Sequence, residues 1–427
     1  MVPPDRATSA SRARDRAALL AVNFFMADMH AGIGSFLGVL LASRGWGTGA
    51  IGTVTAIGGI AGLVAVTPAG TLIDATIRKR TIVIVAGVFT VAASGLILLS
   101  RQFWVIAGAQ AATAIAGAAL GPAVIGITLG VVRQTGFTAQ IGRNQAYNHA
   151  GNMAGAALSG LLGWRFGFAA VFWLAALFAL ITITAVLMIP ACRIDHQAAR
   201  GAAGTDHRLR VKGLRALIES PALLALAGAV ALFHLGNAAM LPLYGLAVVA
   251  THANPFITVS STVVIAQTVM IVASLSAMRV AESQGYWLAI MIAFTALPIR
   301  GLIAAGIITP WGIIPVQILD GIGAGMLSVA VPGLVARLLD GTGHINAGQG
   351  AVLTAQGIGA AISPLLGGHL AQEFGYPTTF TVLGALSVGA LIIWVKYRSV
   401  LQPDNTAYGS GVTSAGGGPG VAHSPVE

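Results

Sequence analysis

The chain contains twelve apolar stretches, each long enough to cross a lipid bilayer as a helix. About 20 apolar residues are needed for one crossing, and within the bilayer the backbone must satisfy its own hydrogen bonds. Charged residues make up only 8% of the chain, against roughly 25% in a soluble domain. The predicted fold class is therefore an all-α integral membrane protein. The stretches lie near residues 17–41, 50–72, 80–100, 103–132, 142–164, 168–190, 222–247, 257–278, 287–307, 311–338, 345–370 and 378–396.

The fifth and eleventh stretches are related in sequence. Residues 145–164 (QAYNHAGNMAGAALSGLLGW) and 349–368 (QGAVLTAQGIGAAISPLLGG) are identical at eight of twenty positions. Their offset of 204 residues is about half of the 427-residue chain, and Gln110 and Gln317 repeat at an offset of 207. Two similar six-helix bundles are therefore predicted. The expected parts are an N-terminal arm (1–16), a first bundle (17–190), a central loop (191–221), a second bundle (222–398) and a disordered tail (399–427).

Basic residues are unevenly divided between the loops on the two sides of the membrane. If the N-terminus is inside, nineteen of the 23 Lys and Arg residues fall on that side, and only Arg44, Arg101 and Arg165 on the other. The positive-inside rule then predicts that both termini and the central loop are cytoplasmic, in a multi-pass protein of the cell inner (plasma) membrane. Because topology explains the net charge of +10, nucleic acid is not an expected partner. The single cysteine, Cys192, excludes an internal disulfide and a cysteine metal site.

The segment 70–80, GTLIDATIRKR, resembles the signature loop of the major facilitator superfamily, G-x-L-a-D-r-x-G-r-k/r. That loop joins the second and third helices on the cytoplasmic side, where the distribution of charge places this segment independently. Ala75 and Ile77 depart from the family pattern, which usually has Arg and Gly there. The matching residues are Gly70, Asp74, Arg78 and Arg80.

This resemblance implies two pseudo-symmetric six-helix bundles that work by alternating access. By analogy, helices one, four, seven and ten line a central cavity, and helices two, five, eight and eleven form the interface between halves. Asp74 lies at a helix end beside three cations, so we expect it to join a charge network that holds the halves together when the cytoplasmic side is closed. Alternatively, the segment is a solvated loop that only fixes topology.

Three charged residues, Asp28, Arg300 and Asp320, fall deep inside the predicted spans, away from their ends. Each costs a few kcal/mol near the helix centre, so each is expected to face protein or water for a reason. Arg300 and Asp320 lie at similar depth on adjacent antiparallel helices and could form an intramembrane ion pair. Paired, they would be structural, whereas an unpaired Asp320 would carry a proton or contact substrate. Asp28 has no basic neighbour in sequence except His30, and it is a candidate for proton coupling or, alternatively, a carboxylate capped by Asn or Ser of a neighbouring helix.

Uncharged polar residues in the spans are candidates for lining the cavity, and their alternative role is to bond helices together. His234 and Asn237 are three residues apart and share a helix face, and His30 matches Asn237 in the repeat. A lone histidine in a helix can equally be a packing residue. The remaining candidates for the cavity are Gln110, Asn148, Asn152, Gln317, Gln349 and Gln356.

The sequence favours a secondary transporter of a small organic compound, with protons, the lipid bilayer and the substrate as its partners and a monomer as its expected state. Export by antiport is favoured over the alternative, proton-coupled uptake. Gln110 stands where drug/proton antiporters of the family carry Arg, and their Pro-containing helix pattern is found only at 363–368, so the support for export is small. An embedded enzyme would need a constellation such as H-E-x-x-H, which is not found. Neither a metal nor a cofactor is expected, and a channel fits the repeated halves less well.

Overall fold

The computed structural model describes residues 9–195, 220–339 and 345–401. Within these ranges the chain is entirely helical apart from short connections. Some side chains within these helices, among them residues 28–33 and 74, lie outside the description. The helices are α1 (Ser9–Ser43), α2 (Thr48–Ala75), α3 (Lys79–Leu99), α4 (Phe103–Phe166), α5 (Phe168–Leu187), the 3-10 turn η1 (Ala191–Arg193), α7 (Pro221–Asn237), α8 (Met240–Ala250), α9 (Pro255–Gln284), α10 (Tyr286–Gly306), α11 (Ile313–Leu338), α12 (Ile345–Lys396) and α13 (Arg398–Leu401).

Two of these helices are each interrupted at one residue. α4 contains 64 residues and α12 contains 52, far more than one crossing needs. The interruptions are Arg133 (φ 56°) and Gly375 (φ 78°). The expected loop between the fourth and fifth spans is therefore helical except at Arg133. Buried side chains tie the two segments of α4 together there, because Gln140 donates to Asn144 Oδ1 and Asn144 donates to Thr128 Oγ1.

The number of crossings is consistent with the predicted twelve. Nine helical segments among the described residues are long and apolar enough to cross a membrane, counting α7 with α8 as one and all of α12 as one. The other three are α1, the second segment of α4 and the second segment of α12. The all-α membrane fold expected from the apolar stretches is confirmed.

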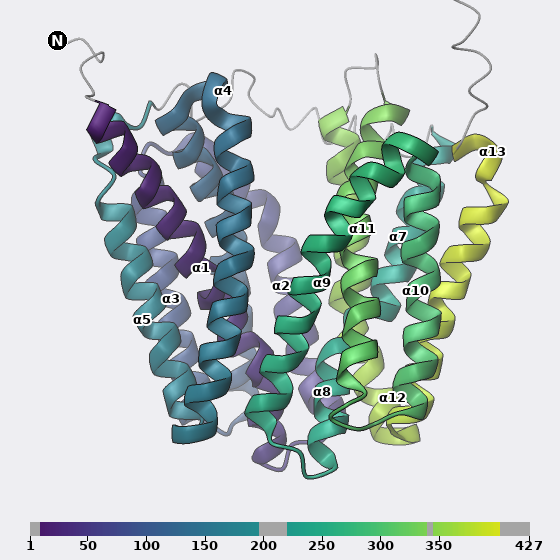
Figure 1. The fold of residues 1–427 in the computed structure, drawn as a ribbon. Coiled ribbons are helices and arrows are strands. Elements are labelled where there is room, and N and C mark those ends of the chain that lie inside the picture. Colours follow the sequence, from purple (N-terminus) through teal and green to yellow (C-terminus); the bar gives the residue numbers. More distant parts are fainter. Residues whose placement is uncertain (1–8, 196–219, 340–344, 402–427) are drawn as a thin grey trace, which may run out of the picture.

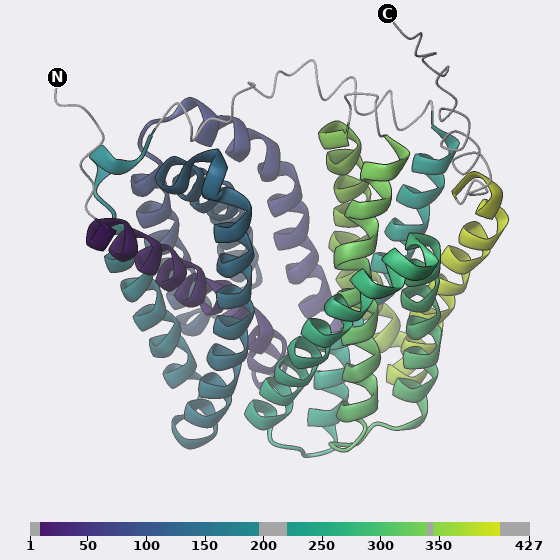
Figure 2. The ribbon, with the colours of Figure 1, turned by 45° about the horizontal axis from the view of Figure 1, so that its top comes forward.

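The helices form two bundles, α1–α5 and α7–α12, which lie side by side (Figure 1). α1 begins and α13 ends at one end of the molecule, the terminal end (Figures 1 and 2). The opposite, distal end contains the start of α9 and the interruption of α12. The bundles converge toward the distal end and diverge toward the terminal end (Figure 1).

The buried apolar residues divide in the same way. The larger core cluster runs through the second bundle and continues into the distal part of the first, where it includes Phe36, Leu40 and Ile97. The other cluster contains residues of the first bundle alone, among them Leu19 and Val186. The halves therefore share one apolar core near the distal end, and the first bundle keeps a core of its own near the terminal end.

Two pairs of helices make most of the contacts between the halves, α2 with α12 and α4 with α9, and α1 adds smaller contacts with α8 and α9. A Cβ atom added to Gly52 of α2 would lie 2.1 Å from the carbonyl oxygen of Pro364 in α12, so the two backbones touch. A Cβ atom on Gly160 of α4 would lie 2.2 Å from Ser260 Oγ of α9. These are the second, eleventh, fifth and eighth crossings, which confirms the interface expected by analogy. Small residues allow helices to approach this closely in a membrane.

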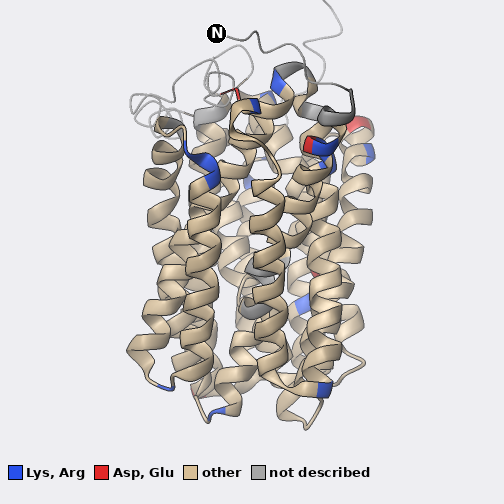
Figure 3. Ribbon diagram, turned by 90° about the vertical axis from the view of Figure 1, so that its left-hand side faces the viewer, with Lys and Arg blue, Asp and Glu red and all other residues tan. Residues whose placement is uncertain are grey.

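Charged residues gather at the terminal end, and few lie at the distal end (Figure 3). At the terminal end, Arg193 forms a two-pronged ion pair with the buried Asp15, with both oxygens 3.0 Å from Nη1. Arg133 pairs with Asp195 at 3.5 Å. At the distal end, Arg44 donates to the carbonyl oxygens of Ile97, Leu98 and Ser100, at the C-terminus of α3. A cation at a helix C-terminus is favoured by the helix dipole.

Candidate functional site

The second bundle contains an ion pair in the membrane-spanning region. Nη1 of Arg300, on α10, lies 2.8 Å from Oδ1 of Asp320, on α11. The same nitrogen donates a hydrogen bond of 2.6 Å to Oδ1 of Asn237, at the end of α7. The Arg300 side chain is fully buried and that of Asp320 is 10% exposed. One guanidinium thus joins three helices. The pairing of Arg300 with Asp320 is the one predicted from the similar depth of the two residues in the membrane.

His234 and Gln317 extend this cluster. His234 lies one turn before Asn237 on α7, and its Nδ1 bonds to the carbonyl oxygen of Val230 at 2.9 Å. Gln317 lies one turn before Asp320 on α11 and is fully buried. Among the described residues, neither its amide nitrogen nor its amide oxygen has a hydrogen-bond partner, and the same holds for Nε and Nη2 of Arg300. The cluster therefore holds more polar atoms than its own contacts satisfy.

The first bundle contributes a different set of polar contacts. Asn148 of α4 donates to the carbonyl oxygen of Asn23 in α1 at 3.2 Å, and Asn152 donates to Asn148 Oδ1 at 3.4 Å. His149 Nδ1 donates to Oε1 of Gln267 at 3.0 Å, which links α4 to α9 across the interface. The predicted residues Asn148 and Asn152 thus come together at a helix contact. Asn23 and Gln267 were not among the candidates, since nothing in the sequence pairs them with the fifth span.

The other polar candidates lie apart from both sets of contacts. Gln349 donates to the carbonyl oxygen of Pro332 at 2.7 Å, so it bonds α12 to α11 within one half. Gln110 and Gln356 are partly exposed, and Gln110 packs against Gly58 of α2. Asp28 and His30 belong to α1, and their side chains lie outside the described residues. Within the described part of the chain, no three His, Cys, Asp or Glu side chains gather as a metal ion would require.

The candidate gate motif lies between α2 and α3. Arg80 donates to the carbonyl oxygen of Leu187 at the end of α5, at 3.1 Å, and Arg78 is exposed at the start of α3. No atom lies within 4 Å of a Cβ built on Gly70, so this arrangement of the halves does not itself require glycine there. The side chain of Asp74 lies outside the described residues.

Lys79 is a residue of this motif whose role the sequence did not reveal. It is 1% exposed, and its ammonium group donates to the carbonyl oxygens of Ile73 and Thr76, which end α2. In the sequence, the signal for such a cap is a cation that follows directly after the end of a predicted helix. The cap holds the start of α3 against the end of α2.

Replacing Lys79 by alanine should lower the free energy of unfolding by about 1–3 kcal/mol, because buried carbonyl groups lose a charged donor. Thermal unfolding in detergent, followed by size-exclusion chromatography, measures the change. The neighbouring Arg78→Ala replacement is the control, because an exposed side chain should change stability by no more than about 0.5 kcal/mol. Equal melting temperatures for Lys79→Ala and the parent would contradict the assigned cap.

The seventh crossing is broken beside the ion-pair cluster. α7 ends at Asn237 and α8 begins at Met240. The backbone N–H of Ala239 donates to Oγ of the buried Ser363, on α12, at 2.9 Å. Its repeat-related residue, Ser159, is equally buried, and its hydroxyl has no hydrogen-bond partner among the described residues. Ser363 therefore stabilises the helix break between α7 and α8 in the second half, whereas Ser159 stabilises no such break in the first.

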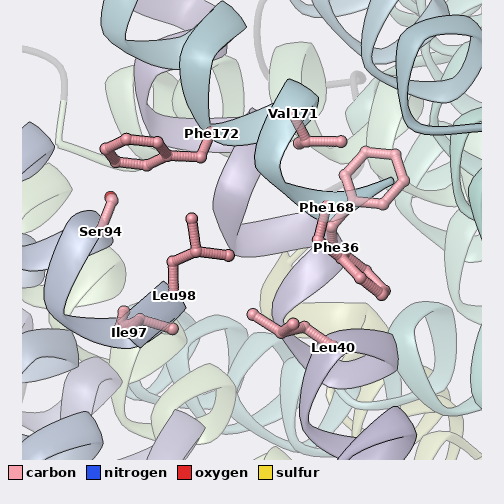
Figure 4. A pocket seen from close by; sticks show the side chains of 8 residues that line it. All are labelled: Phe36, Leu40, Ser94, Ile97, Leu98, Phe168, Val171 and Phe172. Atoms are coloured by element: carbon pink, nitrogen blue, oxygen red, sulfur yellow. The ribbon is translucent and has the colours of Figure 1, made fainter. Parts of the chain in front are cut away.

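A small cavity lies in the first bundle between α1, α3 and α5 (Figure 4). Its volume of about 20 Å³ is far below the 300–1,000 Å³ of pockets that bind small organic molecules. It is not a candidate substrate site. Its lining residues are Phe36, Leu40, Ser94, Ile97, Leu98, Phe168, Val171 and Phe172.

Comparison with known proteins gives a consistent result. The model of the Major Facilitator Superfamily matches residues 18–347 and 287–415. Two uncharacterized MFS-type transporters of Mycobacterium tuberculosis, from strains CDC 1551 and H37Rv, are each 39% identical over 384 residues, covering 88% of this chain and 91% of their own.

Solved structures show the same fold. The nucleoside transporter NupG matches with a TM-score of 0.75 and 13% identity, over 92% of this chain and 99% of its own. A bacterial homolog to the human lysosomal transporter Spinster, in an inward-facing and unoccupied conformation, matches with a TM-score of 0.69 and 13% identity, over 92% of this chain and 97% of its own. Identities this low establish the likeness of fold alone.

Proposed function

Because the chain belongs to the major facilitator superfamily, we propose that it moves a small organic compound across the membrane by alternating access. The observation that carries this proposal is the way the halves meet. They share an apolar core and two glycine-mediated helix contacts near the distal end, and they diverge toward the terminal end (Figure 1). Two rigid halves that make such contacts in one conformation and break them in the other can expose a central site to each side in turn.

We further propose that the terminal end faces the cytoplasm of a bacterial cell and that the structure is inward-facing. Two observations support this orientation: the excess of Lys and Arg in the segments of that end, and the gathering of charged residues there (Figure 3). The similar Spinster homolog is described as inward-facing. The two halves of the expected domain division are then rigid units, and the gate motif around Asp74 would act when the cytoplasmic side closes.

The proposed substrate is a small compound that carries little net charge. A highly charged substrate would need a cluster of opposite charge to replace its hydration. The described charges deep in the spans are Arg300 and Asp320, which neutralise each other. Partly exposed amides and an imidazole lie on α4, α12 and α7, namely those of Gln110, Gln356 and His234. Such groups suit hydrogen bonding to a neutral molecule.

We propose that transport is coupled to protons and that Asp28 carries the proton. Asp28 and Asp320 are the two carboxylates deep in the spans. Asp320 is committed to a buried guanidinium, which supports a structural role for the pair. Export against an inward proton flow is the favoured direction, with the Pro-containing pattern at 363–368 as its support.

The proposal is tested in liposomes that contain the purified protein and a pH indicator. A pH gradient of either sign is imposed, and a panel of neutral small organic compounds is added. We expect at least one compound to move protons, and its flux to run opposite to the proton flux. Asp28→Asn should abolish the proton movement, whereas Glu373→Gln, at an exposed position of α12, should not. Transport of a labelled compound without any proton movement would contradict the coupling, and parallel fluxes would contradict export.

A further inference from the structure

The N-terminus of α2 lacks a cap of its own. The residue at the N-cap position is Gly47, which has no side chain to accept a hydrogen bond from the first turn. Gly49, in that turn, is buried, so its N–H cannot rely on water. This N–H donates to Oε1 of Gln372, on α12, at 3.0 Å. The cap of α2 is therefore supplied by the other half of the protein.

The glycines of this turn leave room for the amide of Gln372. A Cβ atom at position 49 would lie 2.5 Å from Oε1 of Gln372, and one at position 47 would lie 2.9 Å from it. One turn further along, the backbones of the two helices touch, since a Cβ atom on Gly368 would lie 2.5 Å from the carbonyl oxygen of Thr48. The cap forms only while α2 and α12 are in contact.

The second interface between the halves is built differently. α9 also begins at the distal end and packs against the other half, where a Cβ atom on Gly163 would lie 2.3 Å from Phe256. However, the N-cap of α9 is its own Asn254, whose Oδ1 accepts from the N–H groups of Phe256 and Ile257 at 3.0 and 3.1 Å. α9 keeps this cap in any arrangement of the halves. The cap of α2 depends on the arrangement.

We propose that Gln372 is a gate residue that favours the conformation closed at the distal end, by capping α2 across the interface. This rests on the alternating access of the proposed function. When the halves separate at the distal end, the first turn of α2 exchanges the amide oxygen of Gln372 for water, and Gly47 offers no side-chain cap in its place. The cost of an uncapped helix therefore disfavours the distal-open conformation. It lowers the ratio of distal-open to distal-closed molecules about fivefold, compared with a protein that lacks the cap.

The test measures the distance between the halves at the distal end. The single native cysteine is replaced (Cys192→Ser), and spin labels are attached at Gln102→Cys and Trp311→Cys, which are exposed distal positions in the first and second halves. Electron–electron resonance of the protein in lipid nanodiscs then gives the populations of short and long distances. Gln372→Leu should raise the ratio of long to short distances about fivefold, because it keeps the size of the side chain and removes the acceptor.

Two further variants make the result specific. Gln372→Glu retains an acceptor at the helix N-terminus and should keep the ratio of the parent. Asn254→Ala removes the cap of α9, whose partners lie in one half, and should lower the melting temperature without changing the ratio. A folded Gln372→Leu variant with the ratio of the parent, or an equal shift in Asn254→Ala, would overturn the proposed gate.

A last variant separates this proposal from the proposed function. Gly52→Ala places a methyl group against the carbonyl oxygen of Pro364 and must move the helices apart. If Gly52→Ala gives long distances and Gln372→Leu does not, alternating access stands and the cap has no effect on it. If neither variant gives long distances while both remain folded, the rocking of the halves is itself wrong.

Discussion

Replacing Asp320 by alanine is expected to lower the free energy of unfolding by about 3–5 kcal/mol, because it leaves a buried charge without its partner. The Arg300 side chain is fully buried, and its described partners are Asp320 and Asn237. Asn237 supplies a neutral acceptor that cannot balance the charge. Moreover, Nε and Nη2 of Arg300 already have no described hydrogen-bond partner, so the guanidinium has little left to hold it.

Thermal unfolding in detergent measures this loss, and a double replacement makes the interpretation specific. Arg300→Met together with Asp320→Leu removes both charges and should recover most of the lost stability, since apolar residues of similar volume often replace a buried ion pair without cost. Asn237→Ala alone should cost less, about 1–3 kcal/mol. If Asp320→Ala melts with the parent, or if the double variant is less stable than Asp320→Ala, the pair does not hold α10 to α11.

Replacing Gly52 by alanine is expected to slow transport strongly while leaving each half folded. The new methyl group would lie 2.1 Å from the carbonyl oxygen of Pro364 and 3.1 Å from Cα of Gly368, and a backbone atom cannot rotate away as a side chain can. Overpacking of this kind costs about 1–3 kcal/mol. Here the cost falls on the distal-closed conformation alone, so the ratio of conformations should shift by roughly fivefold to 150-fold.

Gly151 provides the matched control for this prediction. A methyl group there would lie 2.0 Å from the carbonyl oxygen of Phe24, an equally close approach, but α1 and α4 belong to the same half. Gly151→Ala should therefore lower the melting temperature without shifting the ratio of conformations. Gly108→Ala, where no atom lies within 4 Å, should change neither. Uptake into liposomes and distal distances check all three variants, and unimpaired transport by Gly52→Ala would contradict the role assigned to this contact.

The features that depend on local pattern were predictable from the sequence. Apolar length gave the helices, the repeat gave the two bundles, and the segment 70–80 gave the family. The pairing of Arg300 with Asp320 followed from counting rise per residue on helices that are adjacent in sequence. The ion pair was predictable because its residues lie in two consecutive helices, whose relative positions helix geometry fixes, and the other features could be read directly as patterns in the sequence.

Contacts between distant parts of the chain were not predictable in the same way. Gln372 and Gly49 are 323 residues apart, and no periodicity relates a surface glutamine to the backbone of a glycine. His149 and Gln267 likewise meet only because α4 packs on α9. Gln349 matches Gln145 in the repeat, yet it bonds within one half, where the carbonyl oxygen of Pro332 accepts from it. Which distant side chain bonds to a given backbone N–H or carbonyl group becomes visible only in the folded molecule.

During synthesis, α10 leaves the ribosome with Arg300 before α11 supplies Asp320, twenty positions later in the chain. Alone in lipid, the guanidinium would oppose insertion by about 2.5–3.5 kcal/mol. Partition of α10 into the bilayer should therefore wait until α11 emerges, so that the two enter as a neutral hairpin. Asn237 has by then already been inserted on α7 and can receive them. The ion pair thus favours the joint insertion of α10 and α11, after α7.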